Sequence, residues 1–217
     1  MGNSLRDSMT LLHTWAGVIL GALLFTIFWM GSLSVFDSEI DRWMKPETRL
    51  SAPAEVPSLD TIAASVEEIL PAEGVSRWQV ALPSERSPAL QVYYLKDGEF
   101  TGHALDPNDA SILVDTDSRA GTGFLYPFHY SLHLRWMSVG YWIVGLAGMM
   151  MMVLLVSGVI MHRKIFKDFF TFRPDRKLPR ATLDLHNVTG VLALPFHFLI
   201  TLSGLIIFFK IYFPNVV

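Results

Sequence analysis

The chain has 217 residues, of which 51% are hydrophobic and 17% charged, and its formal net charge is −3 at pH 7. The charge is concentrated in some segments rather than spread evenly, which indicates one chain with lipid-facing and water-facing regions. The sequence contains no cysteine, so its own side chains exclude a disulfide, a thiolate zinc site and an iron–sulfur cluster. Any redox chemistry must therefore use a bound cofactor.

Three apolar segments are long enough to cross a membrane. They are Leu11–Phe36, Val139–Met161 and Val188–Phe209. The first is about 25 residues long and no small-residue cleavage site follows it, so we expect it to remain as an anchor rather than to be removed as a signal peptide. The fold class predicted is a mainly helical membrane protein with three transmembrane helices.

The segment between the first two spans is predicted to fold as a small α+β domain. Residues 37–128 carry sixteen Asp or Glu and seven Lys or Arg. Ser58 precedes a helical pattern of apolar residues that stops at Pro71. Three strand-like runs follow, at Ser76–Leu82, Ala89–Leu95 and Gly102–Val114. A turn is predicted at Asp106–Asp109, inside the last run.

Charge in the short connections predicts the orientation. The loop between the second and third spans holds seven basic residues against two acidic ones, and an excess of Lys and Arg is typical of cytoplasmic loops. The N-terminus is then also cytoplasmic. The predicted parts are residues 1–36 with the first helix, 37–128 as an exported domain, 129–162 with an interfacial segment and the second helix, 163–182 as a basic cytoplasmic loop, 183–212 with the third helix, and 213–217 as an exported stub.

Five of the seven histidines lie in or at the ends of the three spans, where an ionisable side chain is costly and is therefore a candidate for function. They are His13, His133, His162, His186 and His197. The last two are eleven residues apart. This spacing is about 1100° of helical rotation, so the two lie roughly 20° from the same face and ~16 Å apart along the axis. Such a spacing suits a ladder of two bound cofactors.

Depth in the membrane predicts how the histidines pair. His13, His162 and His186 all fall on the cytoplasmic side, and any two of them could hold one haem iron. We favour His13 with His186, because two basic residues follow His162 directly. Two axial imidazoles leave no open iron position and suit electron transfer rather than oxygen binding.

His197 would hold the second haem, with a partner from the segment before the second helix. His129 and His133 stand there at i,i+4 spacing, on one face of a helix; we favour His133, with His129 as the alternative. Counted along a straight helix, His133 lies ~43 Å from the far end of the second span, which exceeds a membrane core of ~30 Å. The segment must therefore bend, and Pro127 or Gly140 could allow the break.

These residues also have structural interpretations. A histidine at a membrane surface can simply reach the lipid headgroups, and His197 could bond Thr201 or Ser203 on its own helix. His103, in the acidic domain, is expected to be a solvated surface residue. Close approach of helices or of a flat porphyrin is expected at four glycines, Gly17, Gly21, Gly145 and Gly148.

Several long strings resemble a known family. The order helix, strand, strand, strand-turn with ALDPNDASIL resembles a PepSY domain. The membrane segments resemble the PepSY-associated transmembrane family, in LLHTWAGVILG, SGVIMHRKIFKDFFTFRP and LDLHNVTGVLALPFHFLITLSGL. Together with the histidines these strings cover nearly the whole chain, which makes the resemblance more specific than a short motif.

The resemblance implies a bacterial inner-membrane protein containing haem b, similar to reductases linked to ferric-siderophore uptake. It implies as partners the lipid bilayer, a cytoplasmic or membrane electron donor, and a ferric siderophore or other periplasmic acceptor, and no nucleic acid. Family members are commonly longer, so the chain is expected to be a shortened version, and a homo-oligomer would compensate for its low helix count.

We therefore expect transmembrane electron transfer through two b-type haems, ending in reduction of a ferric chelate. The chain would act as a haem-dependent ferric-siderophore reductase or as an electron-transfer subunit. The alternative is a PepSY-like binding or regulatory module held by an inert membrane anchor.

Overall fold

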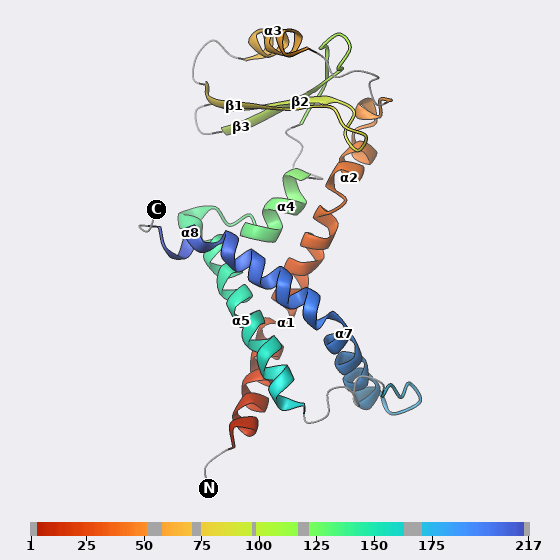
Figure 1. Cartoon of the computed structure of the whole chain (residues 1–217), viewed down its shortest axis with the longest axis vertical. Helices are drawn as coiled ribbons and strands as arrows, with labels where there is room; N and C mark the ends of the chain where they lie inside the picture. The colour runs from red at the N-terminus through yellow and green to blue at the C-terminus, as the bar shows by residue number, and fades with distance from the viewer. Residues whose placement is uncertain are drawn as a thin grey trace. The chain divides into compact units, whose positions relative to one another are not determined.

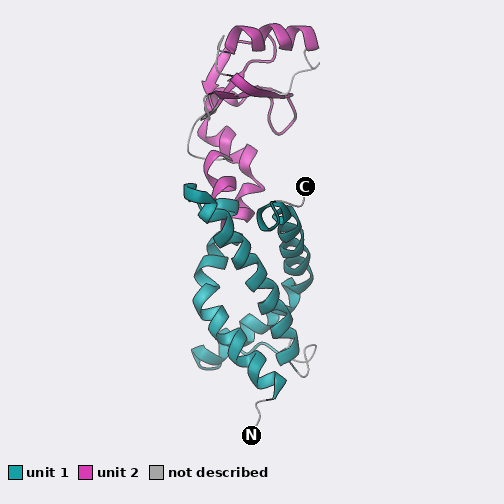
Figure 2. Cartoon of the chain, turned by 90° about the vertical axis from the view of Figure 1, so that its left-hand side faces the viewer, with its two compact units in different colours: residues 1–28, 129–217 teal, residues 29–128 magenta. Residues whose placement is uncertain are grey.

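The computed structural model describes residues 4–51, 58–70, 75–96, 99–116, 122–162 and 171–214. The chain divides into two compact units, one formed by residues 1–28 with 129–217 and the other by residues 29–128 (Figure 2). The first unit is helical. The second contains the sheet.

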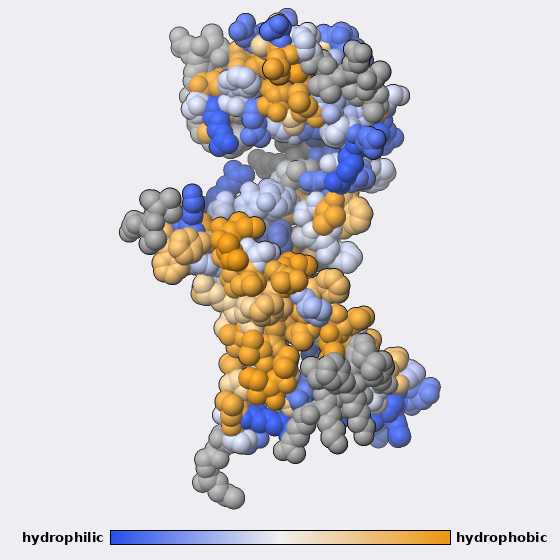
Figure 3. Space-filling view, in the orientation of Figure 1, coloured by the Kyte–Doolittle hydropathy of each residue, from blue (hydrophilic) through white to orange (hydrophobic). Residues whose placement is uncertain are grey.

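Three of the described helices are long and apolar enough to cross a membrane, which confirms the predicted number of spans. They are α1 (Leu5–Ser34), α5 (Val139–Met161) extended by the preceding 3-10 turn η2 (Trp136–Ser138), and α7 (Leu178–Ile207), which the short helix α8 (Phe209–Tyr212) follows. Hydrophobic side chains cover the visible surface over these helices (Figure 3), as helices in contact with lipid require. Both α1 and α7 begin before the predicted spans, because hydropathy marks only the apolar part of each helix.

A small apolar cluster joins α1 to α5. Its buried members are Ala16, Leu24, Ile27, Ala147 and Leu154. A Cβ added at Gly145 would lie 2.6 Å from the Tyr212 hydroxyl, and one added at Gly148 would lie 3.2 Å from a leucine of α7, so close approach is confirmed at both. At Gly17 and Gly21 no atom of the described residues lies within 4 Å of such a Cβ, so no described helix approaches there, and the approach of a porphyrin stays a prediction.

The second unit is built on a four-stranded antiparallel sheet in the order β1-β2-β3-β4. The strands are β1 (Val75–Ala81), β2 (Leu90–Lys96), β3 (Glu99–Leu105) and β4 (Ile112–Asp115). The predicted strands are confirmed, and the turn predicted at Asp106–Asp109 joins β3 to β4. In that turn the backbone and side-chain N–H groups of Asn108 both donate to the Asp106 carboxylate at 2.8 Å.

Helix α3 (Leu59–Ile69) covers one face of this sheet (Figure 1). Ser58 caps it as predicted, because its hydroxyl accepts a hydrogen bond from the backbone N–H of Thr61 at 3.2 Å. The core between helix and sheet consists of Ile62, Val66, Leu90, Val92 and Leu105.

Two further elements have no counterpart in the sequence prediction. They are α2 (Asp37–Met44) and the 3-10 turn η1 (Pro46–Thr48), whereas α4 (Thr122–Ser131) corresponds to the helical segment expected around His129. Arg86, in the connection between β1 and β2, holds the start of α2. Its guanidinium donates to the Glu39 carboxylate at 2.8 and 2.7 Å and to the carbonyl of Val35 at 2.8 Å.

Truncating the centre of the small core should destabilise the sheet unit. Leu105 is 0% exposed, so Leu105→Ala is expected to lower the free energy of unfolding by about 2–5 kcal/mol through lost burial and a residual cavity. Denaturant titration of the full chain in detergent, followed by circular dichroism, measures this. Ile112→Ala, at a β4 site that is 53% exposed, should change little. Equal effects of the two variants would contradict the assignment of the core.

The ion pair at α2 should persist to a lower pH than the ordinary pKa of a glutamate would allow. Hydrogen bonds and charge from Arg86 lower the pKa of Glu39 from 4.5 to about 2. Because the folded-state pKa is the lower one, the contribution of the pair is fully present above pH 4.5 and is lost as the pH falls toward about 2. Glu39→Gln should therefore lower the melting temperature at pH 7, and the difference from wild type should fade between these two values. Glu85→Gln, one residue before Arg86, is the control.

Candidate functional site

His13 lies on α1 and is fixed by the backbone of α5. Its Nδ1 atom lies 3.1 Å from the carbonyl oxygen of Leu154 and 3.1 Å from the hydroxyl of Ser157. A carbonyl oxygen can only accept a hydrogen bond, so Nδ1 carries the ring proton and donates a hydrogen bond to the carbonyl of Leu154. The Ser157 side chain, 1% exposed, donates to the same carbonyl. The Nε2 atom of His13 therefore keeps its lone pair and is available as a metal ligand.

The ring of His186, on α7, lies next to that of His13. The two ring centroids are 6.2 Å apart and the planes are inclined by 67°. Imidazoles bound to opposite sides of one iron have centroids roughly 6.3 Å apart, because each metal–nitrogen bond is about 2 Å. Gly158 leaves space for the His13 ring, since a Cβ there would lie 3.3 Å from Cε1. The pair favoured from depth alone thus has a separation that fits an iron atom.

His162 ends α5 at the same level. Its backbone N–H donates to the carbonyl of Val159 at 3.3 Å, and the backbone of His162 itself is extended. Its ring is close enough to His13 for an electrostatic interaction. His13 is therefore close to both His186 and His162.

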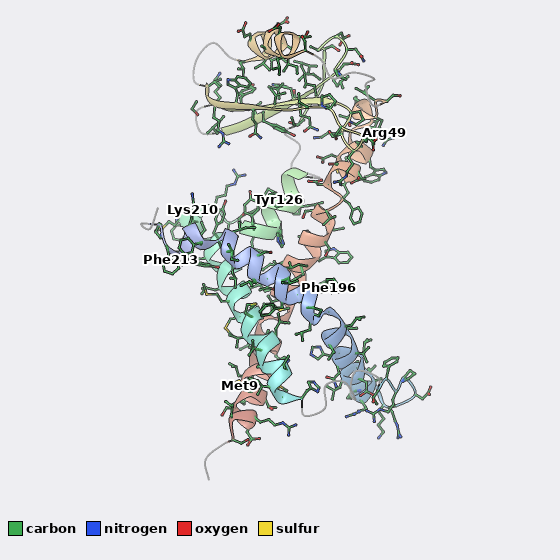
Figure 4. The ribbon with its side chains drawn as sticks, viewed as in Figure 1. Met9, Arg49, Tyr126, Phe196, Lys210 and Phe213 are labelled. Carbon is green, nitrogen blue, oxygen red and sulfur yellow. The ribbon has the colours of Figure 1, made fainter. Side chains whose placement is uncertain are left out.

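His129 lies on α4 and is fixed to α1. Its Nδ1 atom lies 2.8 Å from the carbonyl oxygen of Ile27, so Nδ1 donates and Nε2 is again left available. The next residue of α1, Phe28, packs against His197 with ring centroids 5.1 Å apart. Phe196, the residue directly before His197 on α7, is labelled in Figure 4. Since His186 and His197 both contact α1, they share one face of α7, as their spacing predicts.

His133 does not lie on α4. The helix ends at Ser131, and His133 is in the turn that follows, with φ at 55°. The expectation that His129 and His133 share a helical face is therefore wrong, because the helix stops between them. His129, which was the alternative ligand, lies on α4 and contacts α1 at Ile27, and the next residue of α1, Phe28, packs against His197.

The hydrogen bonds considered for His197 on its own helix do not form among the described residues. The Ser203 hydroxyl donates to the carbonyl of Ile200 at 2.8 Å, and the buried Thr201 hydroxyl has no partner in the described part of the chain. A buried polar atom left unsatisfied costs about 1–3 kcal/mol. The Thr201 hydroxyl, one turn from His197, is therefore a costly unsatisfied group among the described residues.

The turn between α4 and α5 determines where His129 lies. Four of its residues have left-handed φ angles from 46° to 58°: Leu132, His133, Met137 and Ser138. At Gly140 a Cβ would lie 1.7 Å from the carbonyl oxygen of Ser131, so the backbones of the two helices touch. The predicted break is present at this turn, whereas Pro127 lies inside α4.

A charged cluster holds the start of α7, just before His186. Asp184, 2% exposed, accepts hydrogen bonds from Nε and Nη2 of Arg173 at 2.8 and 2.9 Å, and Arg180 lies 3.2 Å away. The sequence analysis used both arginines only to predict the topology. Asp184, an acidic residue in a spanning helix, was the signal that could have predicted a basic partner. Residues 163–170 of the predicted basic loop lie outside the described residues.

His103 is not the solvated residue that the sequence indicated. Its Nδ1 lies 2.8 Å from the Asp115 carboxylate and its Nε2 lies 3.4 Å from the Tyr94 hydroxyl, and its side chain is only 15% exposed. The described residues contain no group of three or more His, Asp or Glu that could hold a bare metal ion. Haem needs fewer protein ligands, because its porphyrin supplies the other four nitrogens.

Two comparisons place the chain among known proteins. A family model described as PepSY-associated TM region matches residues 10–217. A segment of 62 residues is 34% identical to an uncharacterized protein of Pseudomonas aeruginosa. This match covers 29% of the chain and 16% of the length of that protein.

Substituting Gly140 should disrupt the turn that positions His129. Gly140→Ala forces a Cβ against a backbone oxygen that no rotamer change can move, and we expect a loss of about 3 kcal/mol of stability. Thermal unfolding in detergent measures it. Gly190→Ala on α7, where no described atom lies within 4 Å of a Cβ, should be neutral or stabilising by up to about 1 kcal/mol. Similar melting temperatures for both variants would show that the turn tolerates rearrangement.

Proposed function

The chain belongs to the family of PepSY-associated TM regions, and we propose that it carries electrons across a membrane through two b-type haems. His13 and His186 would hold one haem, and His129 and His197 the other. The observation that carries this proposal is the 6.2 Å separation of the His13 and His186 rings, with Nδ1 of His13 already bonded to a backbone carbonyl.

The residues of the chain would prepare each site in the same way. Haem, when bound, supplies reversible one-electron chemistry. The carbonyls of Leu154 and Ile27 hold the Nδ1 protons of His13 and His129, which fixes the tautomer, orients each ring and makes Nε2 more basic. The apolar side chains of the three spans exclude water. Two protein ligands per iron leave no open position, which suits electron transfer.

The two sites would lie at different depths. His186 and His197 are separated by ~16 Å along α7, so an electron passing between them moves across the apolar layer. We propose a bacterial inner membrane with the basic loop before α7 in the cytoplasm, where a cytoplasmic or membrane donor would deliver the electron.

We propose that the acceptor is a ferric chelate, such as a ferric siderophore, on the side of residues 37–128. Fe(III) would gain one electron and become Fe(II), which an oxygen-rich chelator holds more weakly, so that iron is released. The support is the resemblance to reductases of siderophore iron.

A second candidate is a binding module on a membrane anchor. A polar cleft of about 520 Å³ within residues 29–128 favours it, because such a cleft could bind a ligand without redox chemistry. The two functions predict different colours for the purified protein. An electron carrier with haem would be pigmented, and a binding module without haem would be colourless.

The reduced-minus-oxidised visible spectrum of the detergent-purified chain, with haem quantified per chain, tests the proposal. We expect two low-spin b haems in wild type and one in His197→Ala or His186→Ala. His129→Ala should also lose one haem, because His129 is bonded to α1 at Ile27, whereas His133→Ala should keep both, because His133 lies beyond the end of α4. His103→Ala, in the sheet unit, is the control for a histidine substitution.

A colourless protein from haem-replete cells would overturn the electron-transfer function and leave the binding module. Loss of one haem in His133→Ala, with both retained in His129→Ala, would instead reverse the assignment of the second pair.

A further inference from the structure

The polar cleft lies between α2 and the face of the sheet opposite α3, within residues 29–128. Side chains alternate along β2, so that Leu90 and Val92 belong to the core with α3 while Gln91 and Tyr93 line the cleft. A Cβ at Gly102 would lie 2.6 Å from the Tyr93 ring, so this ring packs directly on the backbone of β3. The sheet side of the cleft is therefore a fixed wall.

Lys45, directly after α2, lines this cleft and is nine-tenths buried. In the described part of the chain its ammonium group has one acceptor, the carbonyl oxygen of Thr116 at 3.5 Å, which is a long hydrogen bond. An ammonium group can donate three hydrogen bonds, and burying it is costly unless it is paired. Lys45 therefore brings a buried positive charge to the cleft without a strong partner from the described residues.

Arg42 lies one turn earlier and lines the same cleft. Its Nε atom is buried and has no hydrogen-bond partner among the residues that the structure describes. Arg49, labelled in Figure 4, donates to the carbonyls of Arg42 and Trp43 at 2.7 and 2.6 Å. These bonds satisfy the last carbonyls of α2 and hold this end of the helix, so Arg42 and Lys45 are presented from a fixed backbone.

Two carboxylates complete the lining, those of Asp37 and Asp41. Neither Arg42 nor Lys45 forms an ion pair with a described carboxylate. The cleft thus offers two cations that no described carboxylate pairs with, and two carboxylates that can accept hydrogen bonds. Burial and then the charges of Asp41 and Asp37 raise the pKa of Tyr93, so its phenol stays neutral and donates to Gln91.

We propose that this cleft binds a small hydroxycarboxylate, whose carboxylate is held by Lys45 and Arg42 and whose hydroxyl donates to Asp37 or Asp41. A free hydroxy acid and its metal chelate share this chemistry. Binding requires no haem, so the proposal stands apart from the electron-transfer function and would also give the binding module its ligand class.

Calorimetric titration of the full chain in detergent with citrate, and separately with gallium(III) citrate, tests the proposal. Gallium(III) resembles ferric iron in charge and ligands but is not reduced, so binding is measured without electron transfer. We expect Lys45→Met and Arg42→Gln each to weaken binding at least tenfold, and Lys45→Arg to retain most of it. Arg77→Gln, which removes an exposed cation from β1, should have no effect. Tricarballylate, which is citrate without its hydroxyl, should bind more weakly than citrate.

The two probes distinguish the sources of the ligand. Binding of citrate alone identifies a free acid, and binding of gallium citrate alone identifies a chelate. No binding of either probe to wild type would overturn the proposal. So would unchanged affinity in Lys45→Met and Arg42→Gln, provided that their circular dichroism matches wild type. A colourless preparation that still binds citrate would contradict the electron-transfer function but would support the proposed binding site.

Discussion

An imidazole N–H inside a membrane must be satisfied by protein, because no water is available there, and this constraint organises the helical unit. His13 satisfies it by donating to Leu154 on α5, and His129 does so by donating to Ile27 on α1. Each bond joins two elements and at the same time decides which ring nitrogen is left free. The contacts that pack these elements are therefore also the contacts that would prepare the rings as ligands.

The sheet unit follows the same rule with one exception. Its polar turn at Asp106 and its helix cap at Ser58 are satisfied locally, and Glu39 is satisfied by Arg86. The cations lining the cleft have no carboxylate partner among the described residues, and they lie on or directly after a helix whose end is held in place by Arg49. Burying a charge without an ion-pair partner lowers the stability of the folded state. The cleft differs in this respect from the rest of the unit.

Elements with a local signal could be predicted from the sequence. The three spans follow from hydropathy, the strands from alternation, and α3 from its cap. Helix α2 is short and polar, and its contacts come from Arg86, far along the chain, so no local pattern marks it. The choice between His129 and His133 depended on where α4 stops. Four left-handed residues set that point, and none is a glycine or asparagine that would signal such a conformation.

The bonds between Asp184 and its arginines also set the depth of α7. Charged side chains cost about 2.5–3.5 kcal/mol at the centre of a bilayer, so this turn is anchored near the headgroups. His186 follows only two residues later, ~3 Å along the axis. A redox group bound at that level would lie near the lipid headgroups, roughly within a Debye length of ~10 Å. The surface charge of the surrounding lipid would then shift the midpoint potential of that group.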